Sequence, residues 1–187
     1  MRELLIGVGM ADRMKKNKDI RSELRLHHVN LIRKQNRRFP NLLKNLPRKR
    51  TPTMLFSQGE KLDFKNCVAI VGTRNCSSKG DVFARKLSGK LAKDGFLIVS
   101  GLARGIDRSA HIGAIEAGGK TIAVVAWLPE IYPAEHNALA EDIKKSGCII
   151  SEHFLESKKS KYLFIKRNQI ISALSDFVIV IESGPTG

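Results

Sequence analysis

From residue 66 onward, short apolar runs alternate with longer stretches in which apolar residues recur every three or four positions. Runs with the length and composition of buried strands occupy residues 67–71, 96–99, 121–125, 148–150 and 177–181. The intervening stretches predict helices over residues 80–94, 106–117 and 167–174, with a further helix after Pro133. Strands that alternate with helices predict βαβ units. We therefore expect an α/β fold: a Rossmann-like, doubly wound, mainly parallel sheet flanked by helices.

The N-terminal part of the chain has a different pattern. Residues 14–38 are rich in Lys, Arg, Asn and His, and their few apolar residues form only a thin stripe. We expect residues 1–38 to form a basic, helical N-terminal segment and residues 39–187 to form the Rossmann-fold domain. Pro40, Pro47 and Pro52 mark a connector between these two parts.

Charge gives the first indication of function. The chain has 187 residues, a formal net charge of +15 and a pI of about 10.0. Residues 1–66 carry 17 basic and 6 acidic side chains, against 16 and 12 in the remainder. A strongly basic chain favours a polyanionic partner, usually nucleic acid, although a basic excess also occurs where it serves only solubility.

Several other functions are excluded by composition. No apolar run reaches the roughly 20 residues that cross a bilayer, and the N-terminus does not resemble a signal peptide. Cys67, Cys76 and Cys148 are scattered without a C-x-x-C pair, which argues against a disulfide framework or zinc ribbon and favours a reducing cytoplasm. We find no Ser-His-Asp order and no metal-ligand spacing, and we expect no catalytic residue, metal or cofactor.

Unusual residues follow each predicted strand. The segments concerned are 72–75, 100–107, 127–133, 151–152 and 182–184. In a doubly wound sheet, ligands bind at the carboxyl ends of the strands, where such loops gather. The sequence therefore predicts a ligand site at this edge of the sheet.

The loop after the first predicted strand contains Gly72, Thr73 and Arg74. A glycine allows close backbone approach, a threonine offers a hydroxyl, and an arginine offers a planar fork that suits phosphate. Hydroxyls and amides of Ser77, Ser78 and Gly80 would follow at the helix N-terminus. A tight turn with a solvated arginine explains the same residues equally well.

The loop Ser100–Asp107 is the sharpest feature of the sequence. Gly101 and Gly105 lie four residues apart at the start of a helix, a spacing that can form an anion-binding concavity of backbone N–H groups, and Arg104 adds a cation. The segment is neither a Walker A loop nor a G-x-G-x-x-G fingerprint. We expect Asp107 to be the helix N-cap and His111 to be a packing residue.

These segments together resemble the DNA-processing protein A (DprA/Smf) family. The motifs V-A-I-V-G-T-R, I-V-S-G-L-A-R-G-I-D-x-x-A-H, T-I-A-V, Y-P, S-E and R-N-x-I-I-x-x-L-S occur in one order, and the resemblance covers roughly residues 39–184. Three features depart from the family: the loop at residues 126–133 lacks its glycines, Gln169 replaces an arginine, and the chain looks C-terminally truncated.

The resemblance implies a cytoplasmic protein without cofactor or catalytic turnover. Such a protein binds single-stranded DNA, dimerises and helps load the RecA recombinase in natural transformation or recombination. Phe164 is either a stacking platform for a base or a core residue, while Trp127 is expected to be buried. The residues that the resemblance and the local chemistry assign to DNA or phosphate binding are Gly72, Thr73, Arg74, Ser100, Gly101, Arg104, Gly105, Phe164, Lys166, Arg167 and Asn168.

Two other functions remain open at this point. One is a nucleotide-binding or nucleoside-monophosphate-hydrolysing enzyme of the related phosphoribohydrolase-like group, for which Glu152 and Glu182 are the candidate acids. The other is a general nucleotide- or RNA-binding domain whose affinity comes from the basic segment 1–38.

Overall fold

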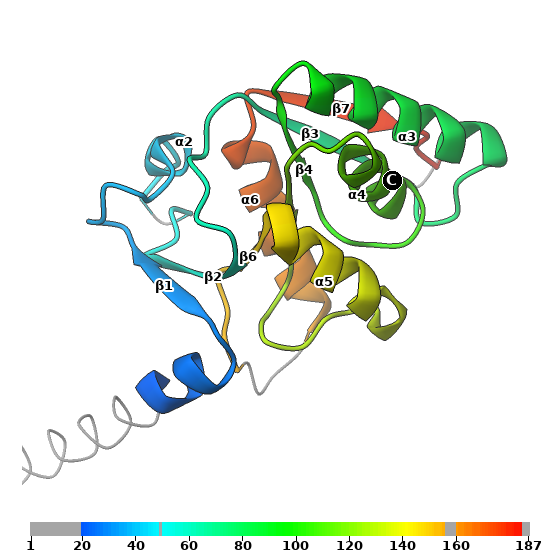
Figure 1. Ribbon diagram of the computed structural model, residues 1–187. Helices are drawn as coiled ribbons and strands as arrows, with labels where there is room; N and C mark the ends of the chain where they lie inside the picture. The colour runs from blue at the N-terminus through cyan, green and yellow to red at the C-terminus, as the bar shows by residue number, and fades with distance from the viewer. Residues whose placement is uncertain (1–19, 49, 156–159, 185–187) are drawn as a thin grey trace, which may run out of the picture.

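The computed structural model describes residues 20–48, 50–155 and 160–184, and within these ranges it contains a seven-stranded sheet between two layers of helices (Figure 1). The strand order is β1-β2-β6-β5-β4-β3-β7. The strands are β1 (Asn30–Arg33), β2 (Met54–Gly59), β3 (Cys67–Gly72), β4 (Leu97–Ser100), β5 (Thr121–Val124), β6 (Cys148–Ser151) and β7 (Phe177–Ile181). Strands β3 to β7 pair in parallel, while β1 and β2 are antiparallel. The mainly parallel α/β fold predicted from the sequence is confirmed.

The helices cover both faces of the sheet. They are α2 (Asn41–Lys44), α3 (Ser78–Lys93), α4 (Ile106–Glu116), α5 (Asn137–Ser146) and α6 (Lys161–Leu174), with a short 3-10 helix η1 (Ala134–His136) before α5. Alternate residues of β3 point to opposite faces: Val68 and Ile70 pack against α3 and α4, while Ala69 packs on the side of α2 and α6. Helix α5 packs on the same face as α3 and α4 through Ile149 of β6.

The predicted elements of the Rossmann part are confirmed with small changes in their bounds. Each expected strand is present, and α3, α4 and α5 lie where their periodicity placed them. Helix α6 begins at Lys161, six residues before the predicted start at Arg167. The extra turn carries the exposed Tyr162 and Ile165, so it lacks the clear separation of apolar and polar faces by which a helix is recognised.

Strands β1 and β2 were not predicted. Asn30–Arg33 pairs with Met54–Gly59 at the edge of the sheet, and Ile32 and Phe39 are buried in the core cluster beneath α6. The last residues of the segment expected at 1–38 thus contribute to the sheet, and residues 20–26 are helical. The expectation for residues 1–19 lies outside the described residues. Within the described part of the chain, no helix is both long and apolar enough to span a membrane.

Helices α3 and α4 pack unusually closely because small residues line their contact. The buried positions of α3 are Gly80, Ala84, Ser88 and Ala92. A Cβ on Gly113 of α4 would lie 2.2 Å from the Arg85 carbonyl oxygen and 2.3 Å from Ser88 Oγ, so only glycine fits there. The first turns of both helices lie at the carboxyl edge of the sheet, because each helix follows a strand that ends there.

Candidate nucleic-acid interface

A cavity of about 670 Å³ opens at the carboxyl edge of the sheet, between the loop after β3, helix α6 and the end of β7. It is lined by Gly72, Thr73, Arg74, Arg167 and Asn168, all of which the sequence assigned to the site. A smaller cavity of about 60 Å³ beside it is lined by Gly101, Arg104, Phe164 and Tyr132, and by the same Arg74 and Arg167. The two arginines therefore belong to both cavities. The structure brings together most of the predicted residues.

Arg74 is an exposed cation without an acidic partner in the described part of the chain. It forms no ion pair within residues 20–48, 50–155 and 160–184, and its guanidinium carbon lies 5.8 Å from the centre of the Phe164 ring. Phe164 packs edge-on against Trp127 at 5.4 Å and Tyr132 at 5.6 Å between ring centres. Trp127 is buried, as expected, whereas Tyr132 is exposed. Phe164 thus packs on one side against a buried ring and lines the cavity on the other.

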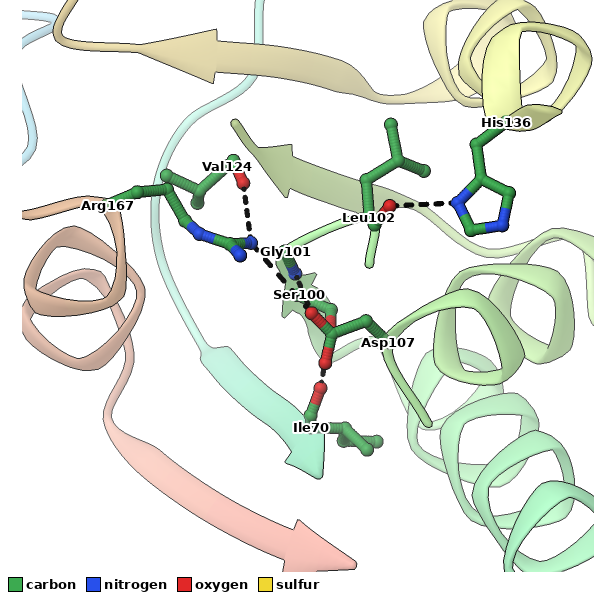
Figure 2. Close-up of polar contacts among 8 residues, drawn as sticks. All are labelled: Ile70, Ser100, Gly101, Leu102, Asp107, Val124, His136 and Arg167. Carbon is green, nitrogen blue, oxygen red and sulfur yellow. Dashed lines mark hydrogen bonds and ion pairs between the residues drawn. The ribbon is translucent and has the colours of Figure 1, made fainter. Parts of the chain in front are cut away.

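Arg167, by contrast, is buried beneath the loop after β4. Figure 2 shows its guanidinium between the Val124 carbonyl oxygen, 3.1 Å from Nη1, and Asp107 Oδ2, 3.8 Å from Nη1. Burial raises the pKa of the Asp107 carboxyl, and the charge of Arg167 opposes that rise. Burial lowers the pKa of the Arg167 guanidinium and the charge of Asp107 opposes that fall, and a guanidinium stays protonated at neutral pH. The Nε of Arg167 has no hydrogen-bond partner among the described residues.

The two glycines of the loop after β4 are required by close contacts. A Cβ on Gly101 would lie 1.4 Å from Arg167 Nη1, so a side chain there would displace the buried arginine. Gly105 has a φ of +70°, and a Cβ on it would lie 2.3 Å from the Thr73 carbonyl oxygen. The loop is held further by Asp107 Oδ2, which accepts the Gly101 N–H at 3.1 Å. Because this N–H is already bonded, it does not contribute to an anion-binding concavity.

The roles expected for Asp107 and His111 have different outcomes. The N-cap prediction for Asp107 is wrong: the N-cap of α4 is Gly105, and Asp107 lies within the helix, where its carboxylate serves Gly101 and Arg167. The packing role of His111 is confirmed, since the side chain is fully buried with Nδ1 2.7 Å from Thr121 Oγ1. Burial lowers the pKa of His111 to about 3, so the ring is neutral.

Ser100 and Lys166 lie outside both cavities. Ser100 is fully buried, and its hydroxyl donates to the Ile70 carbonyl oxygen at 2.6 Å, which ties β4 to β3 (Figure 2). The ammonium of Lys166 lies 5.6 Å from the centre of the Tyr162 ring on the outer side of α6. Of these two residues, only Lys166 carries a charge, and its ammonium lies close enough to the surface to reach a ligand.

Two acidic partners were missed by the sequence reasoning. Arg104 donates from Nε and Nη2 to the Glu135 carboxylate, at 2.8 and 2.7 Å, and both side chains are more than half exposed. The Arg104 guanidinium lowers the pKa of Glu135, and Glu135 raises that of Arg104. Glu182 accepts from the N–H of Ser77 at 2.8 Å and from its hydroxyl, and these bonds lower the pKa of Glu182.

The Glu182 contact changes the interpretation of the α3 N-terminus. Ser77 is the N-cap of α3, and its N–H and hydroxyl were candidate donors to a phosphate. Both donate to Glu182, which follows the neighbouring strand β7. The one available signal was position, because Glu182 begins a segment that follows a predicted strand and Glu135 lies two residues beyond another such segment.

The fold and this edge define a class: Rossmann-like proteins with a cationic, partly aromatic cavity at the carboxyl ends of the strands. The profile of the family described as DNA recombination-mediator protein A matches residues 30–187. The chain belongs to this family, which confirms the DprA/Smf resemblance.

Individual relatives agree with this assignment. The chain is 38% identical to the DNA processing protein DprA of Bacillus subtilis over 157 residues, covering 82% of this chain and 52% of the relative. It is 41% identical to the protein Smf of Synechocystis over 154 residues, covering 79% of this chain and 38% of the relative. The chain thus spans about half the length, or less, of these curated relatives.

Two solved structures have the same fold. DNA processing protein A from Streptococcus pneumoniae superposes with a TM-score of 0.77 at 34% identity, covering 83% of this chain and 55% of that one. The protein from Helicobacter pylori superposes with a TM-score of 0.75 at 30% identity, covering 85% of this chain and 71% of that one. The Helicobacter structure concerns that protein's unique single-stranded DNA binding mode.

Proposed function

We propose that this chain binds single-stranded DNA at the carboxyl edge of its sheet. The observation that carries the proposal is the position of Arg74. This exposed cation lies in the walls of both cavities, beside the ring of Phe164. Proteins that bind single strands combine cations for the phosphates with aromatic faces for the bases. The residues in this role are Gly72, Thr73, Arg74, Gly101, Arg104, Gly105, Phe164, Lys166, Arg167 and Asn168, with Ser100 acting through the backbone of β3.

The contributions of the side chains follow from their positions. Arg74 meets a phosphate, and the cavity side of Phe164 stacks on a base. Asn168 supplies an amide from α6 within the larger cavity. Arg167 acts from below, in the walls of both cavities, where the Val124 carbonyl oxygen and Asp107 hold its guanidinium in place. Lys166 contacts the strand from the outer side of α6.

The biological role that fits this site is protection of incoming or exposed single strands. In the same proposal the protein acts in the cytoplasm as a homodimer, without catalytic turnover, and helps load the RecA recombinase in transformation or recombination. Family membership supports this role. Since the chain spans about half the length of its relatives, the partner surfaces are assigned to the whole protein.

The test is a fluorescence-anisotropy titration of a labelled single-stranded oligonucleotide, with duplex DNA and nucleoside monophosphates as competitors. Arg74→Ala is expected to weaken binding about tenfold, whereas Arg25→Ala, an exposed arginine of the helical residues 20–26, changes it little. Equal loss in both variants, or equal affinity for duplex, would contradict the proposal and point to the basic N-terminal residues.

The same titration separates DNA binding from nucleotide chemistry. Glu182 accepts hydrogen bonds from Ser77 at the start of α3. These bonds keep its carboxylate ionised, so it does not serve as a general acid or base. We expect nucleoside monophosphates to compete weakly and to remain intact. Release of a free base that Glu182→Gln abolishes would replace the DNA-binding proposal with a hydrolase.

A further inference from the structure

Helix α3 has two faces of opposite character. Its buried face consists of Gly80, Ala84, Ser88 and Ala92, at intervals of four residues. The opposite face carries side chains at intervals of three and four residues, all of them exposed: Lys79, Phe83, Lys86, Lys90 and Lys93. We call these five residues the α3 strip. The strip places four ammonium groups and one aromatic ring in a single line along the helix.

The charges of the α3 strip are not compensated within the protein. None of its four lysines forms an ion pair with any residue that the structure describes. Helix α5, which packs against the other side of α4, differs: Lys144 pairs with Glu141, and Lys145 pairs with Asp142. On α3 the only acid is Asp81, which faces α4 and accepts a hydrogen bond from Ser109. The lysines of the α3 strip are therefore unpaired within the described residues, whereas Lys144 and Lys145 of α5 are each paired with an acid.

A groove runs beside the strip. It has a volume of about 620 Å³, lies between α3 and α4, and is lined by Lys86, Lys90 and Lys93 together with Val82. Its far wall holds Glu116, which is paired with Arg85 of α3. The Phe83 side chain is 57% exposed and Val82 48% exposed, so apolar surface lies among the cations at the first turns of the helix. Cations beside an exposed ring form the combination that single strands bind.

The strip begins where the cavity ends. Asn75 lines the larger cavity, Ser77 caps α3, and Lys79 is the first residue of the strip. At 1.5 Å per residue, the strip extends about 20 Å from Lys79 to Lys93. Figure 1 shows α3 as a long, straight helix on the outer side of the molecule. The strip therefore begins four residues beyond Asn75 of the cavity wall.

We infer that the α3 strip is a second binding segment for single-stranded DNA, which holds the phosphates of the strand outside the cavity and stacks a base on Phe83. This inference rests on the proposed function of the cavity. A polyanion is favoured over a second copy of this chain because two copies joined through this face would bring lysines against lysines. The apolar part of the strip, Phe83 and Val82, is too small to offset that repulsion.

The experiment compares two double variants of equal charge. Lys90→Gln/Lys93→Gln removes unpaired cations from the last turn of α3, and Lys144→Gln/Lys145→Gln removes paired cations from the last turn of α5. Each is titrated with a short oligonucleotide of about 6 nucleotides, which fits the cavity alone, and with one of about 20 nucleotides. Each titration is repeated over a series of salt concentrations.

The expected loss of affinity depends on the length of the oligonucleotide and on which helix carries the substitutions. The α3 variant binds the long oligonucleotide several-fold more weakly, and its slope of log K against log salt falls by about 1.4, or 0.7 for each lost phosphate contact. Its affinity for the short oligonucleotide is unchanged, as are both affinities of the α5 variant. Phe83→Ala weakens only the long oligonucleotide.

The outcomes that overturn the inference are distinct from those that overturn the proposed function. If the α3 and α5 variants lose the same affinity, the loss comes from net charge and not from the strip. If wild type binds the long oligonucleotide no better than the short one, the strip is not a binding segment and the cavity remains the only proposed one. Failure of wild type to bind either oligonucleotide would overturn both. A dimer in sedimentation velocity that Phe83→Ala dissociates would assign the strip to protein association instead.

Discussion

The loop after β3 and the loop after β4 contain similar residue types at the same edge of the sheet, but their polar groups are used differently. In the loop after β4, the Ser100 hydroxyl, the Gly101 N–H and the Arg104 guanidinium each have a partner within the protein. In the loop after β3, the Arg74 side chain is exposed and unpaired within the described residues. A ligand therefore reaches Arg74 directly, whereas it must displace Glu135 from Arg104. Glycine and arginine in a loop therefore indicate a binding site only where their polar groups are not already used by partners within the protein.

The largest expected effect comes from breaking the support of the loop after β4. Asp107→Ala would leave Arg167 buried without its counter-ion and the Gly101 N–H without an acceptor. Loss of one member of a buried ion pair typically costs about 3 to 5 kcal/mol of the free energy of unfolding. Urea unfolding followed by circular dichroism measures this loss.

Matched variants show whether charge or hydrogen bonding dominates the contribution of Asp107 to the free energy of unfolding. Asp107→Asn retains an acceptor for Gly101 and should lose less stability than Asp107→Ala. Arg74→Ala, which removes an exposed and unpaired side chain, should leave the free energy of unfolding unchanged. If Asp107→Ala unfolds at the same urea concentration as wild type, the loop does not depend on the Asp107–Arg167 pair.

The Rossmann part of the fold was predictable because it relies on buried parallel strands. Such strands read as continuous apolar runs, as at Cys67–Gly72, and glycines end the helices between them. Strand β1 gave no such signal, since Asn30–Arg33 is a four-residue edge strand in which only Ile32 is buried. Its place in the sheet depends on pairing with β2, a long-range contact that local periodicity does not report.

The site was predictable in position but not in detail. The strand–loop pattern placed Arg74 at this edge, the family resemblance and the local chemistry assigned Phe164 to the same site, and the structure brings the two together. The burial of Arg167 and the pairing of Arg104 with Glu135 depend on how α4, α6 and η1 pack, which the sequence does not express. The Glu182 contact likewise depends on β7 lying beside β3.

A second prediction concerns pH and the buried polar groups behind the loop after β4. Burial, together with the charge of Arg167, lowers the pKa of His111 from 6.5 to about 3. Between these values the unfolded chain binds a proton that the folded chain excludes, so stability is lost as pH falls below 6.5. The His111 contribution amounts to ~2 kcal/mol between pH 7 and pH 5.

The contribution of His111 is isolated by comparing wild type with His111→Gln. Asp107 has a raised pKa and therefore contributes in the opposite direction, with stability that increases as pH falls. Urea unfolding at pH 7 and pH 5 should show a smaller acid loss in His111→Gln than in wild type. Equal losses in both proteins would mean that His111 is protonated in the folded state.

The third prediction compares the two loops directly by their arginines. Arg74→Ala is expected to weaken single-stranded DNA binding about tenfold, and Arg104→Ala only about threefold, because Glu135 already offsets the Arg104 charge. Anisotropy titrations at one salt concentration measure both variants. Equal losses would show that Glu135 releases Arg104 when DNA binds, and the distinction between the loops would then hold only without ligand.

The smallest expected effect is a gain in affinity, which comes from making the second loop resemble the first. Glu135→Gln removes the negative charge that offsets Arg104, although an amide oxygen remains as a neutral acceptor. We expect about threefold tighter binding of single-stranded DNA at low salt, a gain that shrinks as salt screens the added positive charge. Glu141→Gln is the control, since it also removes an exposed acid that pairs with a cation, Lys144 of α5. Equal gains in both variants would trace the effect to net charge, whereas a gain confined to Glu135→Gln would show that Arg104 is held in reserve by its acidic partner.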